Sequence, residues 1–187
     1  MRLVIMGPPG AGKGTQAVVV AGILGVPHIS TGDIFRANVS AGTPLGAEAQ
    51  RYMSSGEYVP DSVTNAMVRD RLSRDDCRPG FMLDGYPRTL EQVTELDMML
   101  QSDGLHLNRV VELTVDTEEV IQRLLKRAQD QGRVDDTVDV IRRRLEVYSE
   151  QTAPLVAVYR ERGLLVQVAG MGSVDEVTAR ILAAVEA

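Results

Sequence analysis

Residues 3–15 read LVIMGPPGAGKGT, and this stretch decides the fold. The apolar run at its start predicts a short buried strand. The glycine-rich run after it matches the phosphate-loop pattern G-x-x-x-x-G-K, with Gly14-Thr15 in place of the usual Ser or Thr directly after the lysine. Glycines let backbone N–H groups turn inward around a phosphate, and the N-terminus of the following helix adds partial positive charge. Lys13 can then reach the outer phosphate oxygens. The alternative is a turn that only links a strand to a helix.

Short β-rich apolar runs alternate with longer segments of helical period along the rest of the chain. Such runs are typical of strands in a parallel sheet that is buried on both faces. We therefore predict an α/β fold, a doubly wound five-stranded parallel sheet with helices on both faces. The expected strands lie at residues 3–6, 26–29, 81–83, 110–115 and 164–168.

Capping signals mark three of the expected helices. Thr43 precedes Pro44 at the first helical position, and Gly56 ends that segment. Asp61 can cap a helix from residue 62 to about residue 74. Residues 173–176, SVDE, form a capping box that opens the last helix.

Composition limits the classes of function. The chain has 187 residues, which fits one domain, and its net charge of −6 gives no general attraction to nucleic acid or to an anionic membrane. Cys77 is the only cysteine, so no intramolecular disulfide and no thiolate zinc site can form within the chain. The first apolar run is too short for a signal peptide or a membrane span. We expect a cytoplasmic protein and, by default, a monomer.

Two further motifs follow the second and third expected strands. Residues 30–33 read STGD, with Arg36 one helical turn past the glycine, and taken alone they are a plausible helix start. Residues 84–89 read DGYPRT. A carboxylate at the carboxyl end of a parallel strand lies beside the phosphate loop, where Asp84 can hold Mg²⁺ through water. Arg88 can clamp a phosphate with two parallel hydrogen bonds.

These motifs resemble the adenylate kinase family over almost the entire chain, from Leu3 to Val177. The family's loop reads G-x-P-G-[AS]-G-K-G-T, and its D-G-[FY]-P-R signature is matched without a departure. The resemblance implies a Mg²⁺-dependent enzyme that transfers a phosphoryl group from ATP to AMP and gives two ADP. It also implies one kinase domain, residues 1–187, with an AMP-binding segment at 30–59 and a short lid at 127–138. Both segments are expected to close over the core and exclude water.

The resemblance assigns roles to individual positions. The residues implied at ATP are Gly10, Ala11, Gly12, Lys13, Gly14, Thr15, Arg123, Arg127 and Gly172. Those implied at AMP are Thr31, Arg36, Met53, Glu57, Tyr58, Val59, Gly85, Tyr86, Pro87, Arg88, Gln92, Arg133 and Arg144. The catalytic set is Lys13, Arg88, Arg123, Arg133 and Arg144, and Asp33 and Asp84 would hold Mg²⁺ through water.

The expected lid is short. Long-lid members of the family carry a β-rich insertion, sometimes with four zinc-binding cysteines, where this chain has only residues 128–131. We therefore expect no zinc. Asp135 and Asp136 would orient the lid arginines, whereas Arg142 and Arg143 are interpreted as a solvated basic face.

Two positions have a second interpretation. Thr89-x-x-Gln92 is a capping box, but the family uses a glutamine at this offset to bind adenine, whose edge suits the donor and acceptor of an amide. We favour the base contact. Gly172 belongs to a loop that resembles the family's adenine-side loop, and a turn that opens a helix explains it equally well.

Two alternative functions are open. A UMP/CMP kinase of the same superfamily usually departs from this chain at Thr31, Thr89 and Gln92. A regulator that senses adenylates without catalysis would have a disrupted Lys13 or Arg88 position, and both residues are intact.

Overall fold

A computed structural model describes residues 1–116, 120, 123–124 and 137–186. Five parallel strands form one sheet in the order β2-β3-β1-β4-β5. Their bounds are β1 Arg2–Met6, β2 His28–Ser30, β3 Phe81–Asp84, β4 Arg109–Thr114 and β5 Leu165–Ala169. The predicted parallel α/β sheet is confirmed, with β1 at its centre and the phosphate loop at the carboxyl end of β1.

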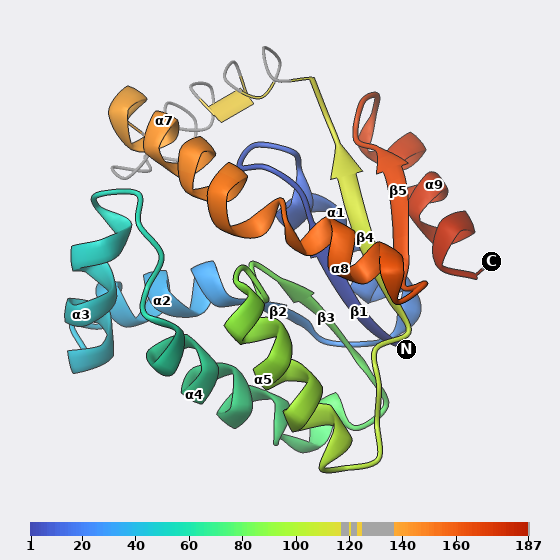
Figure 1. Ribbon diagram of the computed structural model, residues 1–187, viewed down its shortest axis with the longest axis horizontal. Coiled ribbons are helices and arrows are strands. Elements are labelled where there is room, and N and C mark those ends of the chain that lie inside the picture. The colour runs from blue at the N-terminus through green and yellow to red at the C-terminus, as the bar shows by residue number, and fades with distance from the viewer. Residues whose placement is uncertain (117–119, 121–122, 125–136, 187) are drawn as a thin grey trace.

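Helices cover both faces of the sheet (Figure 1). One face packs against α4 Asp61–Leu72, α5 Leu90–Gln101 and α8 Leu155–Glu161, and the other against α1 Lys13–Leu24 and α9 Val174–Glu186. Side chains of β1 alternate between these two cores, because successive residues of a strand point to opposite faces: Val4 and Met6 lie in the first, Leu3 and Ile5 in the second.

The remaining elements lie nearer the edges. Figure 1 shows α2 Thr31–Ser40 and α3 Pro44–Met53 beyond the β2 edge of the sheet, with α2 continuing directly from β2. The two helices and the segment after them form a small apolar cluster of Phe35, Ala49 and Val59. A 3₁₀ turn, Asp75–Cys77, precedes β3, and α7 Val138–Val147 continues through a π-helical turn, Tyr148–Thr152, toward α8. Among the described residues, no helix is long and apolar enough to cross a membrane.

Local backbone chemistry moves two of the expected boundaries. The second strand begins at His28 and not at residue 26. The Val26 N–H is bonded to the Ala21 carbonyl at the end of α1, and Pro27 has no N–H to offer a neighbouring strand. Similarly, β5 begins at Leu165 because the Leu164 N–H bonds the Tyr159 carbonyl and closes the turn after α8.

Two of the three capping predictions are confirmed. Thr43 accepts the Gly46 N–H at the start of α3, and Ser173 and Glu176 exchange hydrogen bonds as a capping box requires. The Asp61 prediction is wrong. Asp61 is the first residue of α4, Pro60 takes the capping position, and the Asp61 carboxylate bonds two side chains from the start of α5 instead.

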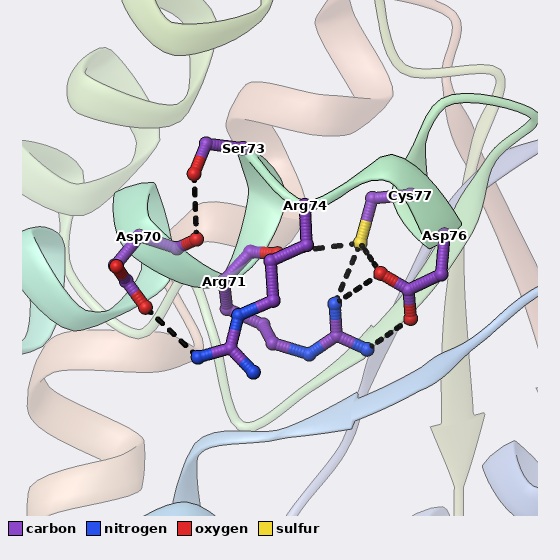
Figure 2. A network of polar contacts seen from close by, with 6 residues as sticks. All are labelled: Asp70, Arg71, Ser73, Arg74, Asp76 and Cys77. Carbon is purple, nitrogen blue, oxygen red and sulfur yellow. Dashed lines mark hydrogen bonds and ion pairs between the residues drawn. The ribbon is translucent and has the colours of Figure 1, made fainter.

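Cys77 lies in a polar network at the end of α4 (Figure 2). Two terminal nitrogens of Arg71 bond the Asp76 carboxylate at 2.9 and 2.7 Å, and one of them is also 2.9 Å from the Cys77 sulfur. Cys77 is 4% exposed. Burial raises the pKa of this thiol above its ordinary value, despite the nearby guanidinium.

Candidate functional site

A cavity of about 800 Å³ opens at the carboxyl ends of β1, β2 and β3. This volume is in the range of nucleotide-sized ligand sites. Its walls come from the phosphate loop, the starts of α2 and α5, and the segment after α3. Residues at the end of α7, in the turn after it and in the loop before α9 complete them. In an open parallel sheet, ligands bind outside the carboxyl ends of the strands, where the connections diverge to the two faces.

The phosphate loop is shaped by glycines that adopt positive φ. Gly12 caps α1 with φ 90°, a conformation that L side chains rarely adopt, and no side chain caps the helix. The first N–H groups of α1 therefore remain available to an anion. The Lys13 ammonium lies over this loop, 2.8 Å from the Gly7 carbonyl oxygen and 2.9 Å from that of Pro8.

Asp84 ends β3 next to this loop. Its side chain is 13% exposed, and its Oδ2 lies 3.6 Å from Nε2 of His28. Burial by itself would raise the pKa of the Asp84 carboxyl, but His28 and the charges of Lys13 and Arg88 hold the pKa below its usual value. The group is therefore ionised at neutral pH, as a carboxylate that holds hydrated Mg²⁺ must be. Asp33 also lines the cavity, is 62% exposed, and pairs with Arg36 at 2.5 Å.

The STGD segment is both a helix start and part of the cavity wall. Ser30 caps α2 by accepting the Asp33 N–H at 3.2 Å, which confirms the structural interpretation of this motif. Thr31 donates its hydroxyl to the Gly85 carbonyl at 2.9 Å and so joins α2 to the loop after β3. A Cβ at Gly85, where φ is 79°, would lie 2.7 Å from the Thr31 hydroxyl oxygen. Only glycine fits there.

Arg88 is held at several points. Its Nε donates to the Gly85 carbonyl at 2.8 Å, and its guanidinium carbon lies 4.9 Å from the centroid of the Tyr58 ring. The Tyr58 hydroxyl lies 2.7 Å from the Thr152 hydroxyl, which donates to the Arg88 carbonyl at 2.9 Å. A guanidinium has five N–H donors. The bond to Gly85 orients its plane and leaves the fork of terminal nitrogens for phosphate oxygens.

Gln92 is 1% exposed, and both ends of its carboxamide are bonded. Oε1 accepts the Arg88 N–H at 2.7 Å, and Nε2 donates to Oδ1 of Asp61 at 2.6 Å. Thr89 caps α5 by accepting the Gln92 N–H at 3.2 Å. The capping box is thus half formed, because the glutamine side chain returns to the N–H of Arg88 and not to that of Thr89.

On the opposite side, Arg123, which precedes the expected lid, contacts the loop before α9. Arg123 donates to the Gly170 carbonyl at 3.4 Å, and Gly172, with φ 112°, leads into the capping box of α9. Arg143 does not form a freely solvated face: it pairs with Glu57 at 2.6 Å and with Glu146 at 3.2 Å. That expectation for Arg143 is wrong because its partner lies far away in the sequence. Arg142 is 69% exposed and pairs with Asp139.

The structure brings most of the predicted residues to this one cavity. Tyr86 and Gln92 are among those with buried side chains; the Tyr86 hydroxyl donates to Asn65, and burial raises its pKa. Arg127 and Arg133 lie outside the described residues, as do Asp135 and Asp136 and most of the expected lid. The predicted residues that line the cavity are Gly10, Ala11, Gly12, Lys13, Gly14, Thr15, Thr31, Asp33, Arg36, Met53, Glu57, Tyr58, Val59, Asp84, Gly85, Tyr86, Pro87, Arg88, Gln92, Arg123, Arg144 and Gly172.

Sequence reasoning missed several residues of this site. The cavity is also lined by His28, Tyr148 and Thr152. Asp61 accepts a hydrogen bond from Gln92, which is itself a lining residue. None of these four belongs to a recognisable motif. Thr152 is the one buried residue of the polar turn Tyr148–Thr152, and nothing in the sequence of that turn distinguishes it from its exposed neighbours.

Fold and cavity together define a phosphate-loop nucleotide-binding protein, in which one cavity extends from the loop to Arg88. The family model described as adenylate kinase matches residues 5–164. The chain is 63% identical over 185 residues to an adenylate kinase of Kocuria rhizophila, covering 99% of this chain and 98% of the relative. It is 62% identical to one of Nocardioides sp., covering 100% and 97%, and 58% identical to one of Thermobifida fusca, covering 100% and 98%. The chain belongs to the adenylate kinase family.

Proposed function

We infer that this chain catalyses the reversible, Mg²⁺-dependent transfer of a phosphoryl group from ATP to AMP, giving two ADP, and so serves adenine nucleotide homeostasis. One observation carries this inference: a single cavity joins the phosphate loop to Arg36, Arg88 and Arg144. A loop that binds the donor's phosphates then faces cations that can bind the acceptor's phosphate. The family membership supports the same reaction.

Phosphoryl transfer needs positioning and charge neutralisation more than covalent participation by the protein. An oxygen of the AMP phosphate attacks the terminal phosphorus of ATP, so no side chain has to act as nucleophile or general base. Lys13, Arg88, Arg123, Arg133 and Arg144 offset the charge that the two nucleotides bring together. The ground-state contacts of Arg88 hold its guanidinium in one plane before the acceptor arrives.

Mg²⁺ bound with ATP would neutralise phosphate charge and hold the phosphates in one geometry. Asp84 fits this ion through water, because it is ionised and lies at the phosphate loop. Asp33 fits less closely, because one of its oxygens is paired with Arg36. Zinc has no part in this proposal, since Cys77 is the only cysteine.

Two segments would complete the site. We propose residues 30–59 as the AMP-binding segment, with Thr31, Met53, Glu57 and Val59 at the base, and residues 127–138 as a short lid. The small apolar cluster of α2 and α3 supports the first of these assignments, because its buried residues are not those of the sheet cores and only partly buried side chains link the two. We also propose that the chain binds ATP, AMP and ADP and has no nucleic-acid or membrane partner. We further propose that it is a cytoplasmic monomer. Exposed large apolar residues lie scattered over several elements and support a monomer.

The test is a coupled assay for ADP formation with AMP, UMP and CMP as acceptors. We expect strong preference for AMP. Comparable turnover of UMP or CMP would favour the related pyrimidine kinases, and no ADP from any acceptor would favour a non-catalytic sensor.

A further inference from the structure

The carboxamide of Gln92 is locked by two groups of fixed polarity. Its Oε1 faces the N–H of Arg88 at 2.7 Å, and its Nε2 faces the carboxylate of Asp61 at 2.6 Å. A backbone N–H can only donate, and an ionised carboxylate can only accept. The opposite orientation would set N–H against N–H at Arg88 and oxygen against oxygen at Asp61. The chemistry of the two neighbours therefore fixes which end is oxygen.

We propose that Asp61 is a positioning residue that makes the enzyme specific for 6-aminopurines over 6-oxopurines. An amide has two N–H donors and two acceptor lone pairs, and the protein occupies one of each. One donor and one acceptor remain for a base. The edge of adenine offers an acceptor at N1 and a donor at N6, which match this pair.

A 6-oxopurine such as hypoxanthine reverses both groups, since N1 carries a hydrogen and O6 accepts. Only the opposite orientation of the carboxamide matches it, and Asp61 and the Arg88 N–H oppose that orientation together. A freely rotating amide would accept both kinds of base. Rejection of the wrong base therefore depends on Asp61, although Asp61 itself need not touch the nucleotide. This inference rests on the proposed function and on the expectation from the family resemblance that Gln92 contacts the base of AMP.

Asp61 accepts a second hydrogen bond, and because of it two substitutions at Asp61 should have different effects. Its Oδ2 accepts the Thr89 hydroxyl at 2.7 Å. In an Asp61→Asn variant, the new amide keeps this bond by turning its oxygen to Thr89, which turns its NH₂ group toward Gln92. That NH₂ group favours the reversed carboxamide. In an Asp61→Ala variant, water can occupy the space and favours neither orientation.

The experiment compares kcat/KM for AMP and for IMP on the full-length enzyme. The AMP-to-IMP ratio should fall in Asp61→Asn by about ten- to a hundredfold, the range of one hydrogen bond to a charged group. The fall should be smaller in Asp61→Ala, and most of it should lie in KM for the monophosphates, with KM for ATP unchanged. The ratio is insensitive to the active fraction of a preparation, so partial unfolding cannot imitate the result. Either variant suffices if the other does not fold.

Two further variants separate the possible failures. Asp70→Asn is the matched control, since Asp70 lies on the same helix, is 71% exposed and pairs with Arg74, and the ratio should stay as in the wild type. In Gln92→Ala the ratio should fall. If it does not, Gln92 does not read the base, and the inference on Asp61 fails with that assignment. If the ratio falls in Gln92→Ala but is unchanged in both Asp61 variants, Asp61 is only structural and the inference alone is overturned. Absence of ADP formation by the wild type would overturn the proposed function itself.

Discussion

Replacing Arg88 by lysine keeps one positive charge in the cavity and removes a planar group that the protein holds in place. Two contacts orient the guanidinium, the 2.8 Å bond from Nε to the Gly85 carbonyl and the stacking on Tyr58. A lysine has no donor on its stem to replace Nε and no planar fork, so its ammonium cannot donate two parallel hydrogen bonds to phosphate from an orientation fixed by Gly85. A comparison of Arg88→Lys with the wild type therefore separates the effect of the positive charge from the effect of the planar guanidinium geometry.

The expected magnitudes differ for the ground state and the transition state. One hydrogen bond to a neutral group contributes about 1 kcal/mol, and a cation–π contact at a partly exposed site about 0.5–1 kcal/mol. Together these contacts contribute about 1.5–2 kcal/mol, so the KM for AMP should rise by about thirtyfold at most. Arginines that stabilise the phosphoryl group during its transfer raise the rate by about 10³–10⁵, which corresponds to a decrease of about 4–7 kcal/mol in the activation free energy. We expect Arg88→Lys to lower kcat by a factor in that range.

The assay is steady-state ADP formation with varied AMP at saturating ATP. Arg36→Lys is the matched control, because Arg36 also lines the acceptor side but pairs with Asp33 and is 34% exposed. It should raise KM for AMP more than it lowers kcat. If Arg88→Lys changes KM alone, then Arg88 is a binding residue and the catalytic assignment is wrong.

Three further predictions follow from the site and from Cys77. Lys13→Met should leave the fold intact by circular dichroism but lower kcat by orders of magnitude, and near-normal turnover would remove the phosphate-loop assignment. Activity should require Mg²⁺ but survive a zinc-selective chelator, whereas unfolding on zinc removal would contradict the short-lid interpretation. Burial raises the pKa of the Cys77 thiol, so less thiolate is present at neutral pH than in free cysteine. Ellman's reagent should therefore react much more slowly with the native enzyme than with the unfolded chain. Equal rates would show that the thiol is accessible.

The parts of the fold that the sequence could predict are those with local causes. The phosphate loop was predictable because its strand, glycines and helix are contiguous, and the conformation of Gly12 depends on its own backbone. Strand positions followed from apolar runs. The strand order β2-β3-β1-β4-β5 could not be predicted in this way, because no local sequence feature indicates which strands pair.

The missed or misassigned residues have partners that are far away in the sequence. Asp61 was predicted as a helix cap, since a carboxylate at a helix start usually caps it, yet its partners are 28 and 31 residues away. Arg143 was interpreted as solvated, because its neighbours in the helix are charged, yet it reaches Glu57 across 86 residues. Such pairings are decided by tertiary packing, and no local sequence pattern indicates them.

The same long-range contacts support the expectation that the AMP-binding segment closes over the core. After α3, the chain is tied to α7 by the Glu57–Arg143 ion pair and to the turn after α7 by the hydroxyl contact between Tyr58 and Thr152. A partly exposed ion pair stabilises by about 0–1 kcal/mol and a neutral hydrogen bond by about 1 kcal/mol. Binding of a nucleotide at micromolar affinity provides about 8 kcal/mol. The buried residues of the α2 and α3 cluster are distinct from those of the two cores, and the partly buried Ile34 and Met67 link this region to the first core. Substrate binding can therefore rearrange these ties at small cost to the rest of the fold.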